Sequence, residues 1–247
     1  MDKIRSLFNC ALILTAHQAY AAITITGPWT GADWYDQEKK MGVDNGIPYS
    51  NDSAYHRRIR SPLSVDGPLD NYKNFRNVQM VESVFPESEW STAFPYANSF
   101  YTYDEFLKGV AKFPMFCNET ALNWPLEKSC RKELANLFAH IGQETGKREG
   151  AESTYWKQGL YYVEEINKNE YKSYEWGNDV KWPPQNGVKY FGRGPLQLTW
   201  NYNYGQFSNI YSGWGYNAKM ELLESPEIVS TNAHAAFAAA IWFYMTP

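Results

Sequence analysis

Apolar residues recur every three or four positions in several stretches of the chain, which is the spacing of an amphipathic helix. The first stretch begins near Asn71 and runs to Phe85, and Pro86 is expected to end that helix. A second helix is expected to begin at Asp104, a residue type that caps helices, and to stop before Pro114.

The clearest helical pattern follows Pro125, a residue well suited to the first turn of a helix. One apolar face is formed there by Leu126, Cys130, Leu134, Leu137, Phe138 and Ile141. A last helix opens at Ser225-Pro226-Glu227 and is apolar on nearly every side from Ala233 to Met245, so we expect it to be buried. Strand patterns are sparse, and the predicted fold class is therefore mainly α.

The N-terminal residues 1–21 have the layout of a secretory signal peptide. Lys3 and Arg5 supply the positive region, residues 7–16 the apolar centre, and Ala19-Tyr20-Ala21 the cleavage site. We therefore expect cleavage near Ala21 and a secreted protein, either extracellular or periplasmic. The apolar run is too short to cross a bilayer, so no membrane span is expected in the mature protein.

Behind this segment, residues 22–74 are dense in Gly, Pro, Asn, Asp and Ser and have no sustained apolar period. They are predicted to be an N-terminal extension or linker. Apart from the start of the first helical stretch near Asn71, the helical patterns lie in residues 75–247, which are predicted to form the main domain.

Cysteine usage changes once the signal peptide is removed, because Cys10 is lost and only Cys117 and Cys130 remain. An even pair in an exported protein favours a disulfide, here closing a short loop ahead of the helix that follows Pro125. Two buried free thiols are the alternative.

Aromatic residues make up 17% of the chain, and the formal net charge is −4. Flat aromatic faces suit stacking on sugar rings or on nucleic-acid bases. Because nucleic-acid binders carry a basic patch, the negative charge argues against nucleic acid and favours a neutral polymer such as a polysaccharide. His140 and Glu144 stand four residues apart, but the His-Glu-x-x-His zinc motif is absent, so no metal is expected.

Glu144 lies at the edge of the apolar face, near the C-terminal end of the helix that follows Pro125. Desolvation and the helix dipole both disfavour a negative charge there, so the pKa of its carboxyl is expected to be raised. A general acid that works near neutral pH needs such a shift. The alternative is a solvated glutamate on a frayed last turn.

The block from Tyr190 to Gly205 interleaves aromatic rings with neutral hydrogen-bonding side chains, which is the inventory of a carbohydrate-binding site. Gly192 and Gly194 allow close backbone approach, and Pro195 is a candidate helix start. A structural loop rich in tyrosine uses similar residues, so the chemistry leaves both readings open.

The sequence Tyr-Phe-Gly-Arg-Gly-Pro-Leu-Gln-Leu-Thr-Trp-Asn-Tyr-Asn-Tyr-Gly at 190–205 resembles the signature of the family 19 glycoside hydrolases, the chitinases of plants and some bacteria. Residues 138–146 resemble the helix of that family that ends in His-Glu-Thr-x-Gly, and residues 100–106 resemble the entry to its catalytic domain. The resemblance covers residues 78 to 247. It implies a lysozyme-like, two-lobed α-helical domain.

The resemblance also implies roles for individual residues. Glu144 corresponds to the general acid, and the general base falls on Glu164, with Glu165 as the alternative. Thr199 stands where the family has a serine that holds the attacking water. The predicted substrate-binding residues are Gln197, Tyr202, Asn203, Tyr190, Trp200 and His140.

The implied reaction is inverting hydrolysis of β-1,4 bonds in chitin or chitooligosaccharides, without cofactor or metal, by a monomer. In inverting enzymes the two carboxyl groups stand roughly 6.5–9.5 Å apart. Gln143 replaces the usual histidine before the acid, and Lys147 replaces a common second glycine. The family continues beyond the position of Pro247, so the C-terminal segment is expected to be missing. A non-catalytic chitin-binding protein and a peptidoglycan-cleaving lysin are the alternatives.

Overall fold

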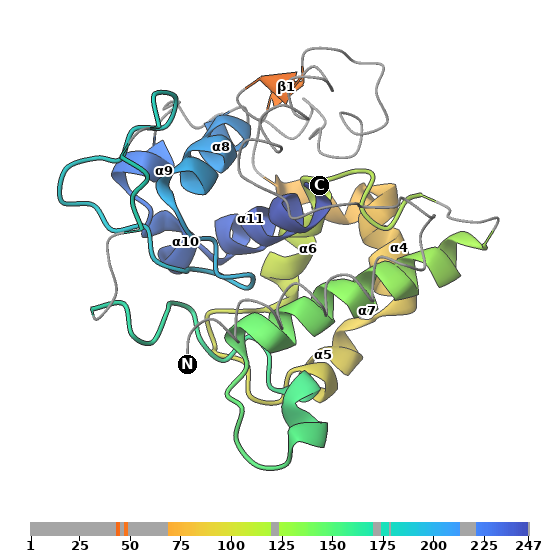
Figure 1. Cartoon of the computed structure of the whole chain (residues 1–247). Coiled ribbons are helices and arrows are strands. Elements are labelled where there is room, and N and C mark those ends of the chain that lie inside the picture. The colour runs from red at the N-terminus through yellow and green to blue at the C-terminus, as the bar shows by residue number, and fades with distance from the viewer. Residues whose placement is uncertain are drawn as a thin grey trace, which may run out of the picture.

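The centre of the molecule is the contact between helices α6 (Tyr103–Ala111) and α11 (Ala233–Met245), shown in Figure 1. The computed structural model describes residues 69–119, 124–169, 174–177, 179–212 and 221–246, and the strands at 43–44 and 47–48. The two helices approach closely at Gly109, where an added Cβ would lie 2.7 Å from Cβ of Phe237. Glycine is therefore required at this crossing.

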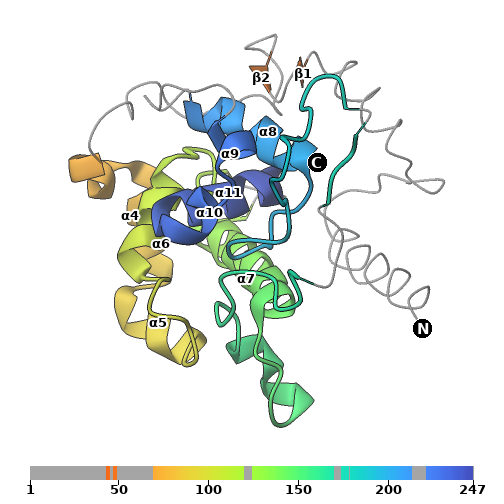
Figure 2. The ribbon, with the colours of Figure 1, turned by 90° about the vertical axis from the view of Figure 1, so that its left-hand side faces the viewer.

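The other elements surround this contact. In chain order they are β1 (Val43–Asp44), β2 (Ile47–Pro48), η2 (Leu69–Asn74), α4 (Arg76–Val84), α5 (Glu87–Ala93), α7 (Leu126–Thr145), η3 (Glu152–Lys157), α8 (Asn201–Ser212), α9 (Glu221–Glu224) and α10 (Ile228–Thr231). The two short strands pair antiparallel, with Val43 opposite Pro48. The fold is mainly α, as the sequence predicts. In Figure 2, α8 and α9 lie at the top, α10 and α11 lie below them beside α6, and α5 and η3 lie at the bottom.

Residues from four helices build an aromatic core. Trp90 of α5 stacks on Phe106 of α6 with ring centroids 5.6 Å apart. Phe237 of α11 meets Phe106 edge to face at 5.5 Å, and Phe138 of α7 meets it tilted at 5.8 Å. Such pairs add to the burial of apolar area and fix the relative positions of the helices that carry them. The predicted apolar face of α7 is accordingly turned inward, with Leu134, Leu137 and Ile141 buried.

The predicted disulfide is present: Cys117 is bonded to Cys130, thirteen residues later in the first turns of α7. Both half-cystines are fully buried. The alternative of two free thiols is therefore wrong. The bond attaches the chain after α6 to the beginning of α7.

The N-cap of α6 is Thr102, and the prediction of Asp104 as the cap is wrong. Thr102, in extended conformation, is the N-cap, and its hydroxyl accepts a hydrogen bond from the Glu105 amide at 3.2 Å. Asp104 lies inside the first turn, where it pairs with Lys108 at 2.8 Å. Threonine and aspartate both cap well, so the backbone conformation decided between them.

The predicted last helix is interrupted. Asn232 adopts extended backbone between α10 and α11, and its side chain accepts a hydrogen bond from the Ala235 amide at 3.1 Å. Pro195 does not start a helix; it lies in a turn, and α8 begins at Asn201 instead. The hydrophobic pattern continues across the break at Asn232, so the sequence gives no sign that α10 and α11 are separate helices.

The predicted signal peptide and most of the predicted linker lie outside the described residues. No helix in the described part of the chain is long and apolar enough to span a membrane.

Candidate active site

Glu144 is the penultimate residue of α7, where the sequence places it. Its side chain is exposed to solvent, yet protein atoms lie densely around the carboxyl. Desolvation accordingly raises the pKa of Glu144 above its usual value, and the charge of Arg148 opposes this only in part. The predicted direction of the shift is confirmed. A carboxyl of this kind keeps its proton to higher pH and still reaches solvent.

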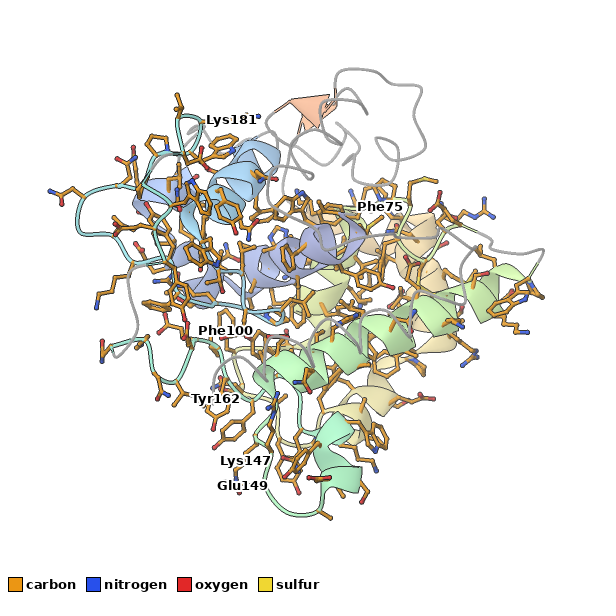
Figure 3. The ribbon with its side chains drawn as sticks, viewed as in Figure 1. Phe75, Phe100, Lys147, Glu149, Tyr162 and Lys181 are labelled. Carbon is orange, nitrogen blue, oxygen red and sulfur yellow. A yellow bond between two sulfur atoms is a disulfide. The ribbon has the colours of Figure 1, made fainter. Side chains whose placement is uncertain are left out.

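The chain after α7 loops out through η3 and returns to the same helix end. The buried hydroxyl of Thr145 accepts a hydrogen bond from the Leu160 amide at 2.9 Å. The backbone oxygen of Thr145 accepts from the amides of Tyr161 at 3.1 Å and Tyr162 at 3.2 Å. Figure 3 shows Tyr162 on the same side of the molecule as Lys147 at the end of α7. These bonds fix residues 160–162 at Thr145, next to Glu144, and residues 163–165 continue the chain away from that point.

Backbone hydrogen bonds then join residues 163–165 to the block at 190–205. The Glu165 amide donates to the Gly192 oxygen at 2.9 Å, and the Gly194 amide donates to the Val163 oxygen at 2.9 Å. Arg193 forms a second bridge with Leu198 on its other side. Arg193 therefore bridges Glu164 on one side and Leu198 on the other, and both candidate bases lie in contact with the signature block.

The Glu164 carboxylate faces charged and buried groups. One oxygen accepts a hydrogen bond from Ser230 of α10 at 2.7 Å and lies 3.7 Å from Nε of Arg193, and the other pairs with Lys168. Burial raises the pKa of Glu164, but the hydrogen bonds from Lys168 and Ser230 and the charges of Lys168 and Arg193 outweigh it. The net effect lowers the pKa of Glu164 below its usual value.

The Glu165 carboxylate faces the other way along the extended segment. It accepts a hydrogen bond from the Tyr174 hydroxyl at 2.7 Å and one from the Gly192 amide at 3.1 Å. The Tyr174 ring meets Trp200 edge to face with centroids 5.5 Å apart. Gly192 itself lies against Gln197, because an added Cβ there would be 2.8 Å from Oε1 of Gln197. Glu165 thus borders the predicted substrate-binding residues.

Arg193 is the buried cation beside Glu164. It is 5% exposed, and its guanidinium lies 3.7 Å from the centroid of the Phe191 ring. It donates to the backbone oxygens of Lys189 and Phe191 and to the Tyr204 hydroxyl at 3.0 to 3.2 Å. A buried cation needs such a set of acceptors.

The predicted sugar-binding residues form a chain of local hydrogen bonds. The Thr199 hydroxyl donates to the Gln197 oxygen at 2.7 Å, and the Asn203 amide donates to the Thr199 oxygen at 2.8 Å. Trp200 stacks on Tyr202 at 6.1 Å with an interplanar angle of 17°. All five side chains keep part of their surface exposed. They offer polar groups and aromatic faces together, on one short segment.

One of the predicted substrate contacts, Tyr190, is placed differently. Tyr190 is fully buried, and its hydroxyl donates to the Leu223 oxygen at 2.7 Å and accepts from the Gln185 amide at 2.9 Å. A side chain without exposed surface braces the block and does not touch a ligand, which corrects the prediction for Tyr190. His140 is half-buried one turn before Glu144, and its ring meets Tyr244 at 6.3 Å.

Three groups around Glu164 were missed by the sequence reasoning: Lys168, Arg193 and Ser230. Ser230 is 66 residues away from Glu164 in the chain. No local pattern signals a contact over that separation. In the described ranges, no three His, Cys, Asp or Glu side chains gather closely enough to hold a metal ion.

Known proteins resemble this chain in sequence. It is 37% identical over 147 residues to basic endochitinase CHB4 of Brassica napus, covering 60% of this chain and 44% of that protein. It is 36% identical over 153 residues to inactive chitinase-like protein 1 of Hevea brasiliensis, covering 61% of this chain and 44% of that protein. The chain thus spans less than half the length of these relatives.

Solved structures resemble it as well. A class IV chitinase of family 19 from Zea mays has a TM-score of 0.51 and 30% identity, over 67% of this chain and 72% of that one. A bacterial family 19 chitinase has a TM-score of 0.51 and 29% identity, over 65% of this chain and 67% of that one. Residues 87–247, well over half of the chain, match the family described as class I chitinase, glycoside hydrolase family 19. The chain therefore belongs to glycoside hydrolase family 19, and its mainly α-helical fold is the lysozyme-like fold of that family.

Proposed function

We propose that this protein is an endochitinase that hydrolyses β-1,4 bonds between N-acetylglucosamine units by inverting general acid–base catalysis. The observation that carries the proposal is the pairing of two unlike carboxyl environments. Glu144 has a raised pKa at a helix end, and the Glu164–Glu165 pair lies on a segment that leads from that helix end to the signature block. Membership of family 19 supports chitin as the substrate.

Glu144 is the general acid of this proposal. Cleavage of a glycosidic bond needs a proton on the leaving oxygen, and the donor must hold that proton near the working pH. The raised pKa of Glu144 meets this need, and its exposed carboxyl is open to a substrate. After donating the proton, the carboxylate is returned to the acid form by water.

The general base is Glu165 in this proposal, which reverses the order of preference from the sequence. Glu165 bonds to Tyr174, whose ring contacts Trp200, and to Gly192, which packs against Gln197. It therefore borders the groups expected to hold sugar and water. Glu164 is paired with Lys168, and the contacts that lower its pKa make it a poor proton acceptor. Glu164 stays the alternative.

The remaining residues bind the substrate and the attacking water. Thr199 presents its hydroxyl oxygen as a water ligand while its proton is donated to Gln197. Trp200 and Tyr202 stack on sugar rings, and Gln197 and Asn203 bond to their polar groups. His140 lies one helical turn before the acid, on the same helix, and bonds to a sugar hydroxyl or to the acid itself.

The proposal is tested with the purified full-length chain on soluble chitooligosaccharides. Wild-type protein is expected to release shorter oligomers, and Glu144→Gln is expected to lose roughly 10²–10⁴-fold in kcat. Glu149→Gln is the matched control, since Glu149 is an exposed carboxylate five residues further on that pairs only with Lys147 among the contacts described. Intact oligomers with wild-type protein, or equal rates for the two variants, would count against the proposal.

A non-catalytic chitin-binding protein is the second candidate. The observation that favours it is the 36% identity to a relative named as an inactive chitinase-like protein. It predicts retention on chitin beads without release of oligomers, and weaker retention of Trp200→Ala. Measuring release and retention on the same beads separates the two candidates.

We also propose that the protein is secreted, on the evidence of the leader sequence at residues 1–21. N-terminal sequencing of the exported protein is expected to begin at Ala22. Retention of the whole protein inside the producing cell would contradict this.

A further inference from the structure

Ser230 is the contact by which α10 reaches Glu164, the first of the two adjacent glutamates. Its hydroxyl oxygen lies 2.7 Å from Oε1 of Glu164 and 3.0 Å from the backbone oxygen of Glu227. One hydroxyl proton serves these two acceptors, and the charged carboxylate at the shorter distance is the stronger one. The helix α10 is thereby bonded to a segment 66 residues earlier in the chain.

A second contact, between Gly194 and Val229, packs α10 against the segment that is bridged to Glu164. Gly194 has φ of +76°, and an added Cβ would lie 3.1 Å from a methyl group of Val229 and 3.5 Å from Cβ of Ala236. Val229 directly precedes Ser230. The segment at 192–194 that pairs with residues 163–165 therefore packs against α10 and α11 where Ser230 bonds to Glu164.

The two glutamates are held from opposite sides. Glu164 is held by Ser230 and Arg193 on the side of α10, whereas Glu165 is held by Tyr174 and Gly192 on the side of the predicted sugar-binding residues. Successive side chains of an extended segment point to opposite faces, so a rotation that frees one carboxylate displaces the other.

We infer that Ser230 is a positioning residue of this enzyme: by fixing Glu164 toward α10, it sets the direction in which Glu165 presents its carboxylate. The inference rests on the proposed function with Glu165 as the base. It gives the adjacent glutamates different tasks, one as an anchor and one as a proton acceptor.

The charged and titratable groups around Glu164 come from several elements. Lys168 lies on its own segment, Arg193 on the signature block, Tyr204 on α8, and Tyr101 on the segment before α6. Glu165 is its neighbour in the chain. Loss of Ser230 removes a hydrogen bond that lowers the pKa of Glu164 and leaves every other one of these groups in place. The pH profile of kcat therefore reports whether Glu164 itself takes the proton.

The experiment compares Ser230→Ala with Thr231→Ala. Both changes remove a hydroxyl from α10 that bonds to the Glu227 oxygen, and only Ser230 also bonds to Glu164. Ser230→Ala is expected to lower kcat on a chitin hexamer roughly three- to thirtyfold, because small misplacements of a reacting group reduce rates steeply. KM and the acid limb of the kcat profile are expected to stay as in the wild type, and Thr231→Ala is expected to match the wild type throughout.

A rescue pair separates the hydroxyl from the volume of the side chain. Ser230→Thr keeps the hydroxyl and is expected to have the kcat of the wild type. Ser230→Val has the shape of threonine without the hydroxyl and is expected to be as slow as Ser230→Ala. Equal kcat for Ser230→Ala and Thr231→Ala would overturn the inference. An acid limb that moves to higher pH in Ser230→Ala would overturn it as well, since it would make Glu164 the base.

Failure of the proposed function is recognised separately, because wild-type protein would then leave the hexamer intact. The bond itself is measured without turnover by following the side-chain carboxyl carbons of the ¹³C-labelled protein during a pH titration. A higher pKa for Glu164 in Ser230→Ala but not in Thr231→Ala supports the anchor, and an unchanged pKa in both variants overturns it.

Discussion

The assignment of the base makes opposite predictions for two neighbouring residues. Glu165→Gln removes the proton acceptor, and a general base contributes typically about 10²–10⁴-fold, so kcat is expected to fall by that factor. Glutamine keeps the size of the side chain: its oxygen still accepts from the Gly192 amide, and its NH2 group donates to the Tyr174 hydroxyl oxygen in place of the other carboxylate oxygen. The loss is therefore expected in kcat, with little change in KM or in stability.

Glu164→Gln is the matched variant, and its effect follows from its contacts. Its partner Lys168 is 41% exposed, and an ion pair of that kind is worth about 0.2–1 kcal/mol. The carboxylate lies 3.7 Å from Nε of Arg193, longer than a hydrogen bond, and the glutamine oxygen still accepts from Ser230. We expect the free energy of unfolding to fall by about 1–2 kcal/mol and kcat to fall less than tenfold.

Initial rates on a chitin hexamer and urea unfolding curves measure both quantities on the same preparations. Glu165→Gln should be slow and as stable as the wild type, and Glu164→Gln should be active and somewhat less stable. The opposite pattern, with Glu164→Gln inactive and Glu165→Gln near the wild-type rate, would refute the argument from neighbouring contacts.

Three further predictions concern the fold. Gly109→Ala places a methyl group 2.7 Å from Cβ of Phe237, and overpacking of about 1–3 kcal/mol exceeds the helix propensity gained, so urea unfolding should show a net loss; an unchanged midpoint would contradict it. Cys130→Ser opens the loop that begins at Cys117, and thermal unfolding should show a loss of about 3 kcal/mol that added reductant does not increase. Burial lowers the pKa of His234 from 6.5 to about 3, so the unfolded chain takes up a proton first as the pH falls below 6.5. Stability should then fall by up to about 1.4 kcal/mol per pH unit, and His234→Gln should flatten that dependence in unfolding curves between pH 7 and 4.

The sequence predicted the helices well where periodicity alone decides. The apolar face of α7 and the buried character of α11 follow from which residues recur at helical spacing, and both are confirmed. Helix ends were less certain because several residue types cap equally well. Thr102 replaces Asp104 as the cap of α6, and Asn232 divides a pattern that reads as one helix.

The sequence predicted which segments carry the candidate site, but it did not predict which side chains in them contact one another. The sequence pointed to Glu144 and the block at 190–205 as candidates, and the raised pKa of Glu144 was expected from its place on the helix. The different surroundings of Glu164 and Glu165 were out of reach, because adjacent residues share every local signal and differ only in the face on which they lie. Ser230 was missed for a related reason, since its contact depends on how α10 docks.

Tyr190 illustrates the limit of residue chemistry. A tyrosine in a block of sugar-binding type suggests a substrate contact, but burial of the ring turns it into a brace between the block and α9. Burial is a property of the packed molecule, and one short segment does not determine it.

The central claim is that Glu144 donates a proton in an inverting hydrolysis. The most direct test follows hydrolysis of a chitin hexamer by ¹H NMR with wild-type protein and Glu144→Gln, and reads the anomeric form of the first products. The account predicts α-anomers from the wild type and a rate roughly 10²–10⁴-fold lower for the variant. β-Anomers as first products, or a variant as fast as the wild type, would contradict it.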